Sequence, residues 1–183
     1  MEELKGETQE QDIKKLILVG LDNAGKTSIL LSLKGVKNLR KFASVNPTRG
    51  SETVTFIAFD AGYNIIDLGG QEAYRTTHLK NFKQHLIGTN KIIYVIDVQD
   101  EERYDMAMEY LKNIVNLIPE SQAIDFSIFL HKFDPDIAQS NKNISDSVIN
   151  GLVAKIKAAL PLKFPYTLHK TSIYTVFEKL KIE

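Results

Sequence analysis

Short apolar runs alternate along this chain with longer stretches in which apolar residues recur every three or four positions. The short runs are rich in β-branched and aliphatic residues and are bounded by turn-forming residues, a pattern that predicts strands. The predicted strands cover residues 15–19, 53–59, 63–68, 91–97, 124–130 and 164–168, with a turn at residues 61–62. The longer stretches predict helices that run up to Leu33, lie within 69–90, and cover 104–118, 148–160 and 174–180.

Alternating strands and helices indicate the α/β class, in which helices cover a mostly parallel sheet. The chain has 183 residues, of which 43% are hydrophobic, and this suits one globular domain with its own core. Residues 1–13 are polar and acidic and predict a flexible N-terminal segment, so we place the domain at 14–183. Ligands of such sheets bind outside the carboxyl ends of the strands.

Composition and charge exclude several classes of partner. The 23 basic residues balance 23 acidic ones, which argues against nucleic acid as a partner. The chain lacks cysteine, which excludes disulfides and thiolate metal sites and fits a cytoplasmic protein. Glu2 and the final Ile182-Glu183 do not match lipidation motifs, and there is no long apolar run. We therefore expect no direct membrane anchor.

A phosphate-binding loop is the strongest motif in the sequence. Gly20-Leu21-Asp22-Asn23-Ala24-Gly25-Lys26-Thr27 matches G-x-x-x-x-G-K-[ST] and lies between a predicted strand and a predicted helix. Backbone N–H groups would face the phosphates, Lys26 would reach the β- and γ-phosphates, and the Thr27 hydroxyl would bind Mg²⁺. The predicted phosphate-binding residues are Asp22, Asn23, Ala24, Gly25, Lys26, Thr27 and Ser28. Kinases, ATPases and GTPases all use this loop, so it does not select the base.

Two further segments carry candidate metal and water ligands. Asp67 ends a strand, where a carboxylate beside the phosphate loop can hold Mg²⁺ through water. Gly70 can offer its N–H to a γ-phosphate, and the Gln71 amide can orient an attacking water, which makes Gln71 the candidate catalytic residue. Thr48 is a candidate second hydroxyl ligand for Mg²⁺. The alternatives are an ordinary tight turn after a strand and a loop threonine after a proline.

The segment from His131 to Asp134 follows a buried strand and predicts a guanine site. The Asp134 carboxylate can accept from both N–H groups on one edge of guanine, a pair that adenine lacks. The aliphatic stem of Lys132 could pack over the base plane. After the last strand, a backbone N–H at Ser172 or Ile173 could bind guanine O6. A charged exposed loop is the alternative for these residues.

In their order and spacing these segments resemble the Ras-like small GTPases over residues 14–183. The resemblance implies a P-loop NTPase G domain, with a six-stranded, mostly parallel sheet flanked by helices on both faces. It also implies GTP or GDP as ligand together with Mg²⁺. Two mobile switch segments, at about 40–52 and 69–85, would bind regulatory and effector proteins.

Two branches of that superfamily share the resemblance. The stretch GLDNAGKTSIL, with Asn46-Pro47-Thr48 and Gly69-Gly70-Gln71, resembles Arf proteins, but Ile66 replaces their tryptophan and residues 1–13 lack their amphipathic helix. The second half, from Ile93 on, resembles the Rag GTPases, which also carry histidine where His131 stands. The Rag likeness implies a homo- or heterodimer, and the mixture suggests a separate lineage of prokaryotic or archaeal origin.

The resulting prediction is a GTP/GDP molecular switch in which Gln71 aligns water for slow, Mg²⁺-dependent hydrolysis. Arg49 or Arg75 could act as an internal arginine finger, or each could be a solvated surface residue. A P-loop ATPase or nucleoside kinase is one alternative. A non-catalytic G-domain scaffold within a Rag-like complex is another.

Overall fold

The computed structural model describes residues 13–35, 45–58, 61–135, 137 and 144–173. In this part of the chain the strands form one six-stranded sheet of order β2-β3-β1-β4-β5-β6. The strands are β1 (Ile13–Gly20), β2 (Ser51–Ala58), β3 (Ala61–Leu68), β4 (Thr89–Asp97), β5 (Asp125–His131) and β6 (Thr167–Lys170). β2 pairs with β3 in antiparallel fashion and the other neighbours pair in parallel, which confirms the predicted sheet.

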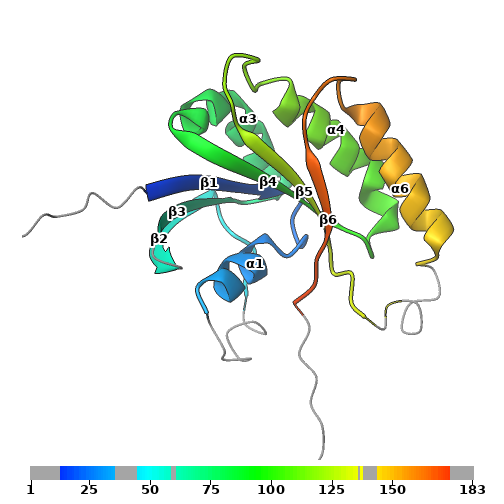
Figure 1. Ribbon diagram of the computed structural model, residues 1–183. Coiled ribbons are helices and arrows are strands. Elements are labelled where there is room, and N and C mark those ends of the chain that lie inside the picture. Colours follow the sequence, from blue (N-terminus) through cyan, green and yellow to red (C-terminus); the bar gives the residue numbers. More distant parts are fainter. Residues whose placement is uncertain (1–12, 36–44, 59–60, 136, 138–143, 174–183) are drawn as a thin grey trace, which may run out of the picture.

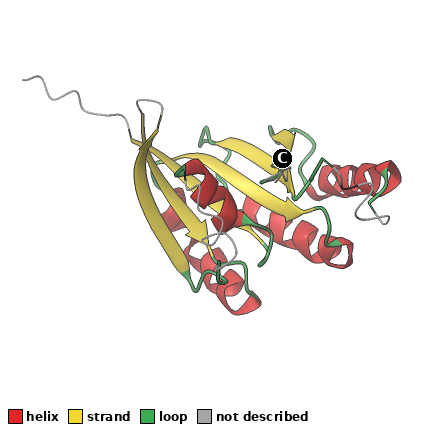
Figure 2. Ribbon diagram, turned by 90° about the horizontal axis from the view of Figure 1, so that it is seen from below, coloured by secondary structure: helices red, strands yellow, loops and turns green. Residues whose placement is uncertain are grey.

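Helices lie on both faces of the sheet, as predicted (Figure 1). They are α1 (Lys26–Leu33), α3 (Glu72–Leu86), the 3₁₀ turn η1 (Glu101–Arg103), α4 (Tyr104–Val115) and α6 (Asp146–Ala159). Figure 1 shows α1 on one face and α3, α4 and α6 on the other, and Figure 2 shows the twist of the sheet from below. No helix in the described ranges is both long enough and apolar enough to cross a membrane.

Each face of the sheet has its own apolar cluster, because successive strand residues point to opposite faces. Ile17 and Val19 belong to the larger cluster, which includes the buried apolar residues of α3, α4 and α6. Leu16 and Leu18 belong to the smaller cluster, which includes Ile29 and Leu30 of α1. The continuous apolar run of β1 therefore reflects a strand that is covered on both faces.

Several predicted boundaries were wrong for local reasons. The last strand was expected at 164–168 but lies at Thr167–Lys170, because the Phe164 N–H bonds to the Pro161 carbonyl and closes a turn there. The helix expected to reach residue 118 ends at Val115. After it the hydrogen bonds join residues three apart, as in a 3₁₀ turn, for example from the Leu117 N–H to the Ile114 carbonyl.

The β2–β3 connection also differs from the prediction. Residues 61–62 were expected to form a turn, but they pair with residues 58 and 57 as the first residues of β3. β1 already begins at Ile13, the last residue of the predicted N-terminal segment. The remainder of that segment, residues 40–44 of the first switch segment and the predicted helix at 174–180 lie outside the described residues.

Strand direction brings the candidate site residues to one edge of the sheet. β1, β3, β4, β5 and β6 run parallel, so their carboxyl ends, including Gly20, Asp67 and His131, share that edge. β2 runs the other way, so Thr48, which precedes it, lies at the same edge. The site is therefore assembled from segments that follow or precede strands, as expected for this class of sheet.

Candidate functional site

The loop after β1 turns sharply before it becomes α1. Asn23 and Gly25 both have left-handed backbone, with φ of 58° and 91°. A Cβ on Gly25 would lie 2.4 Å from Cδ2 of His131, so only glycine fits beneath that imidazole ring. The loop needs glycine here both for its backbone conformation and for the close approach of a side chain from β5.

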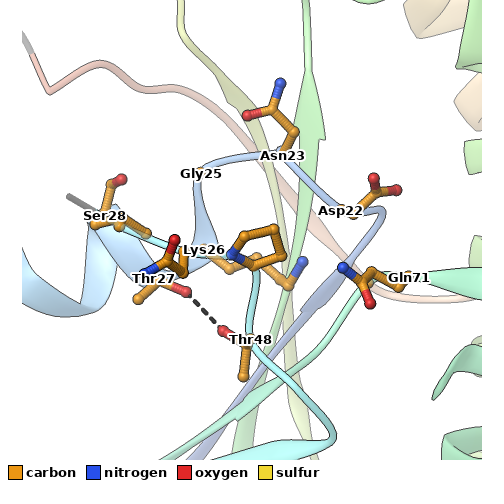
Figure 3. Close-up of a pocket in the computed structure, with 12 residues that line it drawn as sticks. Asp22, Asn23, Gly25, Lys26, Thr27, Ser28, Thr48 and Gln71 are labelled. Atoms are coloured by element: carbon orange, nitrogen blue, oxygen red, sulfur yellow. Dashed lines mark hydrogen bonds between the residues drawn. The ribbon is translucent and has the colours of Figure 1, made fainter. Parts of the chain in front are cut away.

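A cavity of about 360 Å³ opens over this loop. It is lined by Asp22, Asn23, Gly25, Lys26, Thr27, Ser28, Val45, Asn46, Pro47, Thr48, Gly70 and Gln71. Figure 3 shows Gln71 on the side of the pocket away from Ser28. Ala24 does not line the cavity, because its methyl group is buried in the smaller core cluster. Ala24 is therefore the one predicted phosphate-binding residue that the structure does not place on the cavity wall.

Lys26 lies at the bottom of this cavity and is only 5% exposed. Its ammonium donates to the carbonyls of Gly20, at 3.1 Å, and Leu21, at 2.7 Å. Burial lowers the pKa of Lys26 to about 8, against the opposing charges of Asp67 and Asp22. An anion placed beside this ammonium would relieve the cost of its burial.

Three oxygen-bearing side chains meet at one corner of the cavity. The Thr27 and Thr48 hydroxyls both donate to Oδ2 of Asp67, at 2.6 and 3.0 Å. The two hydroxyl oxygens are 2.9 Å apart, as the dashed line in Figure 3 marks. Asp67 is fully buried, and its Oδ1 has no hydrogen-bond partner among the described groups. Hydroxyl and carboxylate oxygens are the ligands that Mg²⁺ prefers, so the predicted metal residues fit this ion.

The segment after β3 packs directly on the phosphate loop. A Cβ on Gly70 would lie 2.1 Å from the carbonyl carbon of Leu21, so the two backbones touch. Gln71 follows at the N-cap of α3 and contributes to the cavity wall. The structure thus brings Gln71 to the same cavity as Lys26 and Thr48.

Two of the three arginines near the site, Arg75 and Arg103, are engaged in contacts with the protein. Arg75 donates to the Gly70 carbonyl at 3.1 Å and lies 5.8 Å from the centre of the Tyr110 ring. Arg103 donates to the carboxylate of Asp22 at 2.9 Å and also pairs with Asp100. Arg49 is exposed, and none of the three is among the residues that line the cavity.

The predicted base-binding residues form a second cluster at the ends of β5 and β6. His131 is 3% exposed, and its Nδ1 lies 3.0 Å from the Thr171 hydroxyl. Burial, and then the nearby charge of Lys132, lower the pKa of His131, so its ring is neutral at neutral pH. The opposite edge of the ring rests on Gly25. His131 thereby connects the base cluster to the phosphate loop.

Lys132 has left-handed backbone, with φ of 60°, which is costly for a residue with a side chain. Two groups from the end of β4 hold it in place. Its ammonium pairs with Oδ2 of Asp97 at 2.7 Å, and the Gln99 amide donates to its carbonyl at 2.9 Å. These contacts stabilise the turn that presents Asp134.

Asp134 receives hydrogen bonds on both carboxylate oxygens. The Ser172 hydroxyl donates to Oδ1, and the Gln99 amide lies 3.4 Å from Oδ2. Ile173 is partly buried against the smaller core cluster. The structure therefore brings the side chains of Asp134 and Ser172 into contact. Ile173, the next residue in the sequence, packs toward the core.

Sequence reasoning missed the side chains that support these residues. Asp97, Gln99, Thr171 and Arg103 all contact predicted site residues. Asp97 could have been found, because it is a carboxylate at the end of a buried strand, as Asp67 is. Gln99 and Arg103 carry no such pattern, since their partners come from distant parts of the chain.

Comparisons with known proteins agree with this architecture. The chain matches the model of the ADP-ribosylation factor family over residues 1–180. It is 31% identical to ADP-ribosylation factor-like protein 2 of Dictyostelium discoideum over 142 residues, 78% of this chain and 72% of that one. It is 30% identical to ADP-ribosylation factor K of the same organism over 134 residues, 73% of this chain and 66%, just under two thirds, of that one.

A solved structure has the same fold. The Arl6 BBS3 small GTPase from Trypanosoma brucei, described with bound nucleotide analogue GppNp, matches with a TM-score of 0.64. The two are 17% identical, and the match covers 87% of each chain. The Rag-type interpretation of 131–134 and a prokaryotic or archaeal origin stay predictions. The chain belongs to the ADP-ribosylation factor family, a family of small GTPases.

Proposed function

We propose that this protein is a GTP/GDP molecular switch that binds the nucleotide phosphates in the cavity over residues 20–27 and the guanine base at 131–134. The observation that carries the proposal is the convergence of Lys26, Thr27, Thr48 and Asp67 at one cavity. The similar solved structure was described with the nucleotide analogue GppNp, which supports a nucleotide for this fold.

Mg²⁺ is the cation that the corner formed by Thr27, Thr48 and Asp67 would hold. When bound there, it would supply positive charge to the β- and γ-phosphates. The buried Lys26 ammonium would add a second positive charge on the same phosphates. Asp67 would act as the carboxylate of this site because it is fully buried and one of its oxygens has no partner.

Hydrolysis by the isolated protein should be slow. Gln71 lines the cavity, and its amide can orient a water molecule for attack. Arg75 and Arg103 are engaged with Gly70 and Asp22, so neither is available in this geometry to stabilise the transition state. A partner protein would supply the missing positive charge, as arginine fingers do in other GTPases.

The switch would act through other proteins. Segments 40–52 and 69–85 would contact regulators and effectors, since Thr48 and Gln71 join both segments to the cavity. Recruitment to a membrane would run through such a partner, and the protein would act in the cytoplasm. Because the second half of the chain resembles the Rag GTPases, we also propose that the protein forms a homo- or heterodimer.

Nucleotide competition tests the binding part of the proposal. A fluorescent GDP analogue bound to the purified protein should be displaced by GDP and GTP but not by ADP or ATP. Addition of a chelator should weaken the GTP complex, because Mg²⁺ would be removed from the threonine corner. Equal displacement by ADP would assign the protein to the ATPase or kinase class instead.

Single-turnover hydrolysis tests the catalytic part. The wild-type protein loaded with GTP should release phosphate slowly, and Gln71→Leu should bind GTP equally well yet hydrolyse it about tenfold more slowly or worse. An unchanged rate in Gln71→Leu would remove Gln71 from the mechanism. Binding without any turnover, even with partner proteins, would instead favour the non-catalytic scaffold.

A further inference from the structure

Helix α3 contacts the segment before β2 through a buried histidine. His78 is 5% exposed, and its Nε2 lies 3.1 Å from the Gly50 carbonyl oxygen. A carbonyl can only accept, so Nε2 carries the proton and donates it. Burial lowers the pKa of His78, which keeps the ring neutral at neutral pH and leaves this N–H as its single donor.

The Gly50 carbonyl joins the two predicted switch segments. It accepts the Gly69 N–H at 2.8 Å as well as the His78 N–H. Gly69 follows Asp67 by two residues, and Gly50 follows Thr48 by two residues. The carbonyl therefore lies between the metal corner and α3.

Thr48 is held on its other side by the metal corner. Its hydroxyl lies 3.0 Å from Oδ2 of Asp67 and 2.9 Å from the Thr27 hydroxyl. The short stretch from Thr48 to Gly50 is thus attached at one end to candidate Mg²⁺ ligands and at the other to His78. A shift of this stretch away from the metal corner would break the hydrogen bond to α3.

We propose that His78 is a positioning residue: its hydrogen bond to Gly50 holds Thr48 at the metal corner and couples the position of α3 to the nucleotide state. The proposal rests on the proposed function, because it assigns a role to Thr48 in a γ-phosphate complex. The bond favours the closed arrangement of the two segments and contributes nothing once they separate. Loss of this one bond should shift the closed-to-open equilibrium about fivefold.

The affinity ratio between two nucleotides measures that shift. His78→Leu keeps an apolar side chain of similar size but removes the donor, so it should weaken binding of a non-hydrolysable GTP analogue about fivefold relative to GDP. His78→Gln should restore most of the ratio, because its amide N–H₂ can reach the same carbonyl. His85→Leu is the matched control: His85 lies on the same helix, and its ring stacks edge-on against His78 at 6.3 Å.

A purely structural role for His78 predicts different results. In that case His78→Leu would lower the unfolding temperature and weaken the binding of both nucleotides equally. The affinity ratio would then be unchanged, and His78→Gln would have no ratio to restore. Either result overturns the proposal. A wild-type protein that binds neither nucleotide would instead refute the proposed function, so the two failures are distinguishable.

The wild-type protein offers a test that does not depend on a folded variant. In ¹⁵N-resolved NMR, the Nε2 proton of His78 should be hydrogen-bonded and protected from exchange in the complex with the GTP analogue and Mg²⁺. In the GDP complex the same proton should exchange faster, because the Gly50 carbonyl would move away. Equal protection in the two complexes would overturn the proposal.

Discussion

The phosphate end and the base end of the site are held together in different ways. At the phosphate end the candidate ligand-binding groups make their hydrogen bonds within the site: the Lys26 ammonium donates to two loop carbonyls, and the two threonine hydroxyls donate to Asp67. At the base end the carboxylate of Asp134 is held by two side chains that are not themselves candidate ligand groups, the Gln99 amide and the Ser172 hydroxyl; only the backbone N–H of Ser172 is a candidate for the base. Ligand binding at the phosphate end must therefore replace hydrogen bonds that Lys26 and the two threonines make within the protein. At the base end the Asp134 carboxylate is already held in position before a base binds.

This difference separates affinity from selectivity. Exchangeable bonds around a buried charge favour strong binding of phosphate of any nucleotide. A carboxylate that is held from two sides can discriminate against a base that lacks the matching N–H donors. The carboxylate cannot turn away to find other donors, so binding such a base would leave it without those hydrogen bonds. His131 links the ends by resting on Gly25, so they are not independent.

The largest expected effect is at the phosphate end. Lys26→Met should weaken binding of both GDP and GTP about a thousandfold or more, because two charge-assisted hydrogen bonds to phosphate are lost. Equilibrium titration with fluorescent GDP measures the loss. Lys155→Met is the control, since Lys155 is a more exposed lysine paired with Asp105 far from the cavity. A loss below tenfold would mean that Lys26 does not contact phosphate.

Substitution at the base end should change selectivity rather than phosphate binding. Asp134→Asn should lose about a hundredfold in GDP affinity and gain affinity for xanthosine diphosphate, whose C2 carbonyl can accept from the new amide. Competition between the two diphosphates measures the switch. Asp125→Asn, at the opposite end of β5 and paired with Lys91, should leave both affinities unchanged. Retained GDP affinity in Asp134→Asn would refute the base assignment.

Nucleotide affinity should also fall at alkaline pH because of Lys26. Its pKa is about 8 in the protein, and a bound phosphate would raise that value. Below pH 8 the residue is charged in both states and affinity is constant; above it, binding must take up a proton and affinity falls up to about tenfold per pH unit. Titrations at about pH 7 and about pH 9 measure this dependence. Lys26→Arg stays charged throughout, so its weaker binding should not vary in this range.

The smallest expected effect concerns the supports of the base end. Gln99→Leu should weaken GDP binding about fivefold, because the strained Lys132 turn and Asp134 each lose one hydrogen bond. The change should appear as faster dissociation of GDP and as a smaller ratio of GDP affinity to ADP affinity. Gln122→Leu removes a similar amide-to-carbonyl bond, to Leu86 at 2.8 Å, away from the site. Equal effects of the two substitutions would show that Gln99 acts only through general stability.

Much of the fold was predictable because its elements follow local patterns. Apolar runs placed the core strands, and the glycine-lysine-threonine pattern placed the phosphate loop and the start of α1. The last strand was misplaced because Phe164 and Tyr166 are apolar enough for a strand, yet the chain turns at Pro161 and their side chains pack on the larger cluster. Apolar content alone cannot distinguish these two uses of an aromatic residue.

The candidate site was predictable in its ligand groups but not in their supports. Lys26, Thr27 and Asp67 lie in motifs whose chemistry requires those residue types at that spacing. Arg75 was considered a catalytic candidate, but it faces Gly70 and Tyr110 in the structure. An arginine follows no spacing rule that reveals its partner, since its long side chain reaches whatever the fold places nearby.

The sequence by itself determined three backbone features of this protein: the strand β1, a glycine-bent loop after it, and the start of a helix that together can hold an anion. It also placed the candidate base-binding carboxylate, Asp134, just after β5. Only the tertiary structure decided that His131 rests on Gly25, that Gln99 supports Asp134 and that His78 reaches Gly50. Backbone conformation depends on neighbours in sequence, which a motif records. Contacts between distant side chains depend on strand order and register, which are settled when the whole sheet assembles.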